Sequence, residues 1–183
     1  MTTRLILPGW HGSGEGHWQR LWLEHDDKAK FVEQPDWDRP DLDTWMKRLH
    51  AAVKAEEEPP ILVAHSLGTA LVAHYALNHP RAKVLAALLV APGDADLHAP
   101  ANPEIATFAP VPRKRLPFPA VLVVSRNDAL MDHARAIELG RDWGARIVDL
   151  GDAGHINADS GYGRWPQGLD LADELEAAAE LAR

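Results

Sequence analysis

Three residues that together support nucleophilic catalysis follow three separate apolar segments of the chain. Ser66 comes after the run 61–64, Asp128 after the run 121–124, and His155 after the run 146–150. A serine hydroxyl is a poor nucleophile at neutral pH unless a base takes its proton, and that base needs an acid to orient it. The order serine, acid, histidine is typical of one fold that carries such a triad. We therefore expect Ser66 to be the nucleophile, Asp128 the acid and His155 the base.

Ser66 has the sequence setting of a nucleophile elbow, a sharp turn between a strand and a helix. The apolar run 61–64 leads into it, and the mostly apolar stretch 67–77 follows at once. Small residues two positions before and after the serine let the helix pack against the strand, and here they are Ala64 and Gly68. Glycine is usual at both positions, so Ala64 departs from the pattern by one methyl group.

An oxyanion formed at Ser66 needs backbone N–H donors, and two segments offer them. Leu67 would begin the helix, where the first N–H groups have no partner within the helix. The glycine-containing loop 8–14 follows the first apolar run, and we expect Trp10 to supply the second amide. Trp10 and His11 are also the residues expected to contact the substrate. The glycines of this loop do not match a nucleotide-binding pattern.

The acid is the triad member with the most competitors. Asp128 follows the fifth apolar run, whereas Asp132 is better suited to capping the helix that follows it. Asp152 precedes His155 too closely to face its ring easily, but the sequence leaves it as the alternative.

Short apolar runs alternate with helical patterns along the whole chain. Uniformly apolar runs are typical of parallel strands that are covered on both faces. We predict a three-layer α/β/α, doubly wound fold with a mostly parallel six-stranded sheet, in a single domain over residues 1–183. The expected strands are 5–7, 30–33, 61–64, 84–91, 121–124 and 146–150, and the expected helices are 17–24, 42–53, 67–77, 132–141 and 166–181.

The segment 92–118 interrupts this alternation. Prolines recur through it and just beyond, so it is expected to form neither a long helix nor a central strand. It leaves the fourth strand at its C-terminal end, where open α/β sheets bind ligands. It is expected to be a lid-like excursion that contacts substrate, or else a packed surface loop.

Composition excludes several classes of function. The chain has no cysteine, which rules out disulfides, thiolate catalysis and cysteine-based zinc sites. Its net charge of −8 argues against nucleic acid and anionic membrane surfaces as partners. The first apolar run is too short for a signal peptide, and no stretch is long enough to span a bilayer, so a cytoplasmic protein is expected. The histidines show no metal-ligand spacing, and neither a metal nor another cofactor is expected.

Several segments together resemble the small serine hydrolases typified by YdeN and by retinoblastoma-binding protein nine. They occur in family order and cover nearly the whole chain. The resemblance implies a minimal α/β-hydrolase fold with a Ser66, Asp128, His155 triad. Binding of retinoblastoma-type pocket proteins is not expected, because it uses a cysteine-containing motif. The matching segments are 8–13 with His17 and Trp18, 65–68, 125–128, 154–157 and 160–166.

These observations predict a serine hydrolase that cleaves a small ester, an amide or a short peptide. Two other classes remain open. One is a binding protein that keeps the fold but is catalytically silent, and the other is an enzyme of different chemistry, such as a lyase or a cofactor-free oxygenase.

Overall fold

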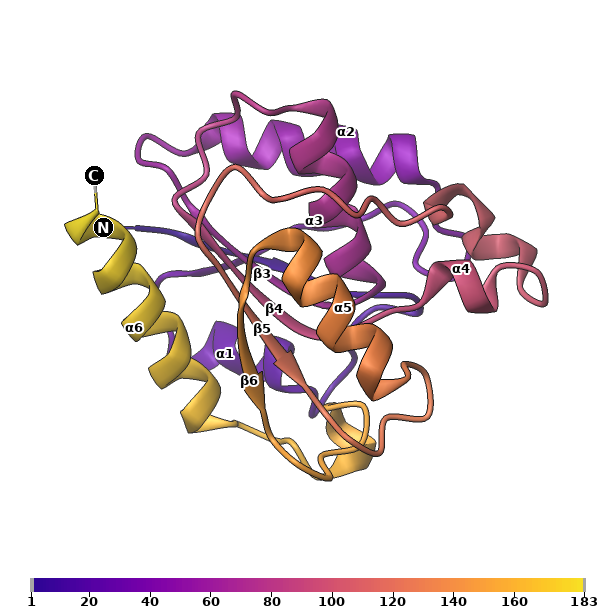
Figure 1. Ribbon diagram of the computed structural model, residues 1–183. Coiled ribbons are helices and arrows are strands. Elements are labelled where there is room, and N and C mark those ends of the chain that lie inside the picture. Colours follow the sequence, from indigo (N-terminus) through magenta and orange to yellow (C-terminus); the bar gives the residue numbers. More distant parts are fainter. Residues whose placement is uncertain (1, 183) are drawn as a thin grey trace.

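A six-stranded sheet forms the centre of the computed structural model, which describes residues 2–182 (Figure 1). The strand order is β2-β1-β3-β4-β5-β6, and every neighbouring pair is parallel. The predicted fold class is therefore confirmed, with a sheet that is parallel throughout rather than mostly so. The strands are β1 (Arg4–Leu7), β2 (Ala29–Phe31), β3 (Ile61–Ser66), β4 (Ala86–Pro92), β5 (Ala120–Val124) and β6 (Arg146–Asp149).

Helices cover both faces of the sheet, which explains why its central strands are apolar on both sides. One face packs against α2 (Leu42–Ala55), α3 (Leu67–Asn78) and α5 (His133–Trp143). The other packs against α1 (Trp18–His25) and α6 (Pro166–Leu181), which lie together in Figure 1. The central helix α3 is buried along most of its length, as expected for an apolar helix between α2 and the sheet.

The helix ends follow the capping signals of the sequence. Asp41 caps α2 and Asp132 caps α5, each by accepting a backbone N–H three residues ahead. Gly144 ends α5 in the left-handed conformation, and Pro166 occupies the first turn of α6. Asp132, a competitor of Asp128 for the role of acid, thus serves as the N-cap of α5, as its position in the sequence favoured.

The connections leave β1 and β3 in opposite directions. From β1 the chain crosses through α1 to β2 at one edge, whereas from β3 it crosses through α3 toward β4 on the other side. The loops after these adjacent strands therefore diverge and leave a crevice at the carboxyl end of the sheet, where such folds bind ligands. Ser66 and the loop 8–17 both lie at this point.

The proline-containing excursion after β4 holds only short helices within the described chain. These are α4 (Ala95–His98) and the 3₁₀ helix η1 (Pro103–Phe108), and a second 3₁₀ helix, η2 (Ala158–Ser160), follows β6. In Figure 1 the α4 region projects beside the amino end of α3 and the carboxyl end of the sheet, away from α6. Ile105 and Phe108 of η1 are buried against the α2–α3 side of the core.

Candidate active site

Ser66 occupies a strained turn between β3 and α3. Its backbone has φ 54° and ψ −124°, a conformation that non-glycine residues rarely adopt. A Cβ added at Gly68 would clash with the Leu7 carbonyl oxygen and lie 2.9 Å from that of Pro8. Only glycine therefore lets α3 approach the end of β1 this closely. Ala64 is fully buried, and its methyl group is part of the core on the α3 side.

The three residues expected to form the triad are joined by consecutive hydrogen bonds, from Ser66 to His155 and from His155 to Asp128. The Ser66 Oγ is 2.9 Å from His155 Nε2. The His155 Nδ1 is 2.8 Å from Asp128 Oδ2 and 3.0 Å from Oδ1. The Asp128 carboxylate is buried and can only accept, so the ring proton lies on Nδ1 and Nε2 is left to accept from the Ser66 hydroxyl. Asp152, the alternative acid, is exposed.

The loop after β5 holds the backbone of the loop that carries His155. The Ala153 N–H donates to Ser125 Oγ at 3.0 Å, and the Gly154 N–H donates to Asn127 Oδ1 at 2.7 Å. The N–H of His155 itself donates to Ser160 Oγ at 3.1 Å. Residues 125–128 thus support the loop that carries the histidine, and they include Asp128, the expected acid. The sequence pattern identified this segment but not the contacts that its polar side chains make.

Two further histidines, to which the sequence assigned no role in the site, lie behind His155. The His65 Nε2–H donates to the His155 carbonyl oxygen at 2.8 Å, and the two rings are 4.9 Å apart. The His17 ring is 4.8 Å from that of His65, and its Nδ1 caps α1 by accepting the Gln19 N–H. Burial lowers the pKa of His17 to about 4 and lowers the pKa of His65 well below its ordinary value. Both rings are therefore neutral at pH 7.

Two glycines keep the space around the Leu67 amide open. Leu67 is the first residue of α3, so its N–H has no partner within the helix. A Cβ at Gly9 would lie 2.9 Å from this nitrogen, and one at Gly93 would lie 2.8 Å from it. Gly9 immediately precedes Trp10, the other expected donor. The backbone of the loop after β1 therefore comes close to the start of α3, as an oxyanion site requires.

A cavity of about 210 Å³ opens at Ser66. Trp10, Leu67 and Leu130 line it together with residues of the excursion after β4. His11 is not among the lining residues: its exposed ring stacks on Trp10, and its Nδ1 is 2.8 Å from Asp38 Oδ1. The geometry thus supports Trp10 as a contact residue and gives no support to His11. The remaining lining residues are Gly93, Asp94, Ala95, His98, Asn102 and Ile105.

The one fully buried carboxylate of this lining is paired with a cation. Asp94 Oδ2 lies 2.5 Å from Arg135 Nε, and a second nitrogen of Arg135 lies 2.7 Å from Asp96 Oδ2. These carboxylates raise the pKa of Arg135 above its already high value, although its partial burial opposes the shift. The wall of the cavity is therefore tied to α5, and the charge of its Asp94 carboxylate is balanced by Arg135.

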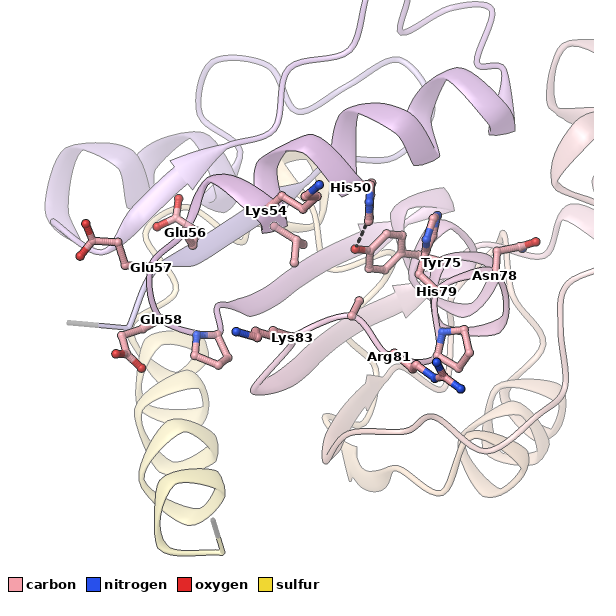
Figure 2. Close-up of a pocket in the computed structure, with 14 residues that line it drawn as sticks. His50, Lys54, Glu56, Glu57, Glu58, Tyr75, Asn78, His79, Arg81 and Lys83 are labelled. Atoms are coloured by element: carbon pink, nitrogen blue, oxygen red, sulfur yellow. Dashed lines mark hydrogen bonds between the residues drawn. The ribbon is translucent and has the colours of Figure 1, made fainter.

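A larger cavity, of about 540 Å³, lies elsewhere, near the C-terminal ends of α2 and α3 (Figure 2). His50 Nδ1 is 3.1 Å from the Tyr75 hydroxyl oxygen, and the His50 ring stacks on His79 at 4.3 Å. Burial raises the pKa of Tyr75 to about 12, so it is not a base at neutral pH. None of Ser66, His155 and Asp128 borders this cavity, so we identify the candidate site by the chemistry of its residues rather than by the size of the cavity.

Within residues 2–182, no three histidine, aspartate or glutamate side chains are arranged to hold a metal ion. No helix in the same range is both long and apolar enough to cross a membrane.

A parallel sheet with a strained serine at the end of its third strand defines the class as an α/β-hydrolase. The model of the serine hydrolase family matches residues 4–174, and the chain belongs to this family. No curated protein sequence matches the chain.

Solved structures agree with this assignment. A YdeN-like hydrolase from Pectobacterium atrosepticum is 28% identical, with a TM-score of 0.87 over 98% of this chain and 92% of that one. The ydeN gene product of Bacillus subtilis is 20% identical, with a TM-score of 0.76 over 97% and 100% of the two chains. The esterase RhEst1 from a Rhodococcus species is 12% identical, with a TM-score of 0.66 over 95% and 90%. The last two similarities concern the fold alone.

Proposed function

We propose that this serine hydrolase cleaves a small ester or amide bond through an acyl-enzyme on Ser66. The observation that carries the proposal is the continuous line from Ser66 Oγ through His155 to the buried Asp128 carboxylate. Family membership supports hydrolysis as the reaction class.

In the first half of the reaction, His155 Nε2 takes the Ser66 proton as Oγ attacks the carbonyl carbon of the substrate. The amides of Leu67 and Trp10 stabilise the oxyanion, and Asp128 stabilises the imidazolium. When the tetrahedral intermediate collapses, His155 passes the proton to the leaving alcohol or amine. In the second half, His155 takes a proton from water, the hydroxide attacks the acyl-enzyme, and the acid is released as Ser66 regains its proton.

The size and lining of the cavity favour a short, uncharged acyl group. Its volume of about 210 Å³ lies below the roughly 300–1,000 Å³ of typical ligand pockets. Ile105, Leu67 and Leu130 offer apolar surface, while the Asp94 carboxylate is already paired with Arg135. A long acyl chain or a charged acyl group would find neither room nor a partner there.

A series of p-nitrophenyl esters from acetyl to dodecanoyl tests both parts of the proposal. We expect kcat/KM to be highest for short chains and to fall for long ones, and we expect Ser66→Ala to abolish turnover. Wild-type silence across the series and across matching amides would contradict hydrolysis and favour a binding role.

Two exposed leucines provide a matched test of the cavity. Leu130 lines it and Leu77 does not, yet their side chains are similarly exposed, at 45% and 44%. Leu130→Ala should reduce kcat/KM by about tenfold, the cost of lost apolar contact, while Leu77→Ala should leave it unchanged. Equal effects of the two substitutions would contradict the assignment of this cavity.

A further inference from the structure

Two buried N–H groups hold consecutive carbonyls of the loop that carries His155. The His65 Nε2–H donates to the carbonyl oxygen of His155 at 2.8 Å. The Trp18 Nε1–H donates to the carbonyl oxygen of Ile156 at 2.9 Å. His65 comes from β3 and Trp18 from α1, and both side chains are buried. The peptide groups on either side of Ile156 are therefore fixed from two elements of the scaffold.

The loop needs such support because its backbone is strained. Ile156 has φ 47°, a conformation in which a β-branched residue is a true outlier. Strained backbone of this kind persists only where the surroundings hold it in place. The carbonyl that His65 binds belongs to the peptide group between His155 and Ile156, so this hydrogen bond fixes the strained dihedral next to the base.

His65 is also the residue that immediately precedes Ser66. One residue thus joins the backbone of the nucleophile to the backbone of the base, which lies 90 positions further along the chain. Because burial keeps the ring neutral, His65 donates this hydrogen bond without placing a positive charge beside His155.

We propose that His65 is a positioning residue that sets the distance between Ser66 Oγ and His155 Nε2. It acts through the carbonyl of His155 and does not touch the reacting atoms. This inference rests on the proposed function, because it assigns a task in the reaction of Ser66.

The test compares His65→Leu, which removes the donor, with His65→Gln, whose amide nitrogen can replace Nε2. His65→Leu should lower kcat by about 100-fold, the effect of a small misplacement of reacting groups, with KM changed less than threefold. Labelling of Ser66 by a fluorophosphonate should slow in parallel. His65→Gln should restore kcat to within about tenfold of wild type.

His74 provides the matched control for loss of stability alone. It too is a buried histidine whose Nε2–H donates to a backbone carbonyl, that of Phe108 at 2.9 Å, away from the Ser66–His155 line. We expect His74→Leu to lower the melting temperature but to leave kcat within threefold of wild type. If His65→Leu does not fold, Trp18→Phe removes the neighbouring donor while keeping an aromatic ring, and should lower kcat at least fivefold.

Three results would overturn the inference. The first is a wild-type kcat in folded His65→Leu, and the second is an equal reduction of kcat in His65→Gln and His65→Leu. The third applies where only Trp18→Phe folds, and it is a wild-type kcat in that variant. Ser66→Ala separates this failure from failure of the proposed function. If Ser66→Ala is inactive while His65→Leu is fully active, only the positioning role is lost.

Discussion

At the residue scale, the two nitrogens of His155 have different partners. Nδ1 faces the buried Asp128 carboxylate, and Nε2 faces the Ser66 hydroxyl. In the proposed reaction the carboxylate fixes which nitrogen carries the proton, and so makes Nε2 available as a base. This role depends on the charge of Asp128 rather than on its shape.

Asp128→Asn should therefore lower kcat by about three to four orders of magnitude, since the amide can stabilise the wrong tautomer of the histidine. This loss of kcat is measured by the steady-state hydrolysis of a short p-nitrophenyl ester. Asp152→Asn, at the exposed alternative position, is the control and should retain wild-type activity. The reverse pattern would transfer the role of acid to Asp152.

Sequence order was enough to nominate the three residues of this line but not those that support them. Ser66, Asp128 and His155 each follow an apolar run, and parallel strands bring such positions to one edge. The ring contacts of His65 and His17 were not predicted, because they depend on the path of a loop far along the chain. His11 does not line the cavity: its backbone has φ 65°, and its ring contacts Asp38, which the order of residues along the chain does not reveal.

At the element scale, the position of Ser66 depends on how closely α3 approaches the end of β1. Gly68 makes this approach possible, because any Cβ there would collide with backbone carbonyls, which cannot rotate away. The sequence pattern also raised the question of Ala64, where glycine is usual. The structure accommodates its methyl group in the core, so the demand for a small residue is strictest at Gly68.

Gly68→Ala should lower the free energy of unfolding by about 1–3 kcal/mol or more, because the overpacked helix must move away from β1. Urea denaturation measures the change. Gly14→Ala is the control: its added Cβ meets nothing within 4 Å, and the variant should be as stable as the wild type. If Gly68→Ala were as stable as the wild type, α3 would not approach the end of β1 as closely as the structure shows.

The excursion after β4 depends on an ion pair with α5. Asp94 is fully buried and Arg135 is its cationic partner, so Arg135→Gln leaves a buried charge without compensation. We expect this variant to lose about 3–5 kcal/mol of stability, measured by thermal or urea unfolding.

The double variant Asp94→Asn with Arg135→Gln removes both charges. It should be more stable than Arg135→Gln alone, and additive losses would contradict a coupled pair. Prolines in the sequence predicted the irregular path of this segment. They did not predict that Asp94 and Asp96 attach it to α5, because that contact joins segments about forty positions apart.

At the scale of the whole molecule, the apolar runs predicted the sheet and both of its covered faces. The order of the strands in the sheet was not predicted. It depends on how the connecting helices pack, and the periodicity of apolar residues does not encode that packing. The crevice between the loops after β1 and β3 is a property of the topology, and it brings Ser66 and the Trp10 loop together.

The buried His17 makes global stability depend on pH. Its pKa is about 4 in the folded protein and near 6.5 in the unfolded chain, so between these values the unfolded state binds a proton that the folded state does not. Stability is therefore complete above about pH 6.5 and falls as the pH drops toward 4. His17→Asn keeps a capping oxygen for α1 and removes the titrating group.

Urea unfolding between pH 7.5 and 4.5 measures this effect. The wild type should lose up to about 3 kcal/mol more over this range than His17→Asn, from a shift of about 2.5 pKa units. His65 remains in both proteins, so the variant should still lose some stability. Identical pH dependence of the two would contradict the burial of His17 in its neutral form.

The most direct test of the central claim is to locate the adduct of a fluorophosphonate probe by peptide mass mapping. We predict one adduct per chain, on Ser66, with labelling strongly slowed in His155→Ala, where the base is missing. An adduct on any other residue, or ester hydrolysis that persists without modification of Ser66, would contradict the account.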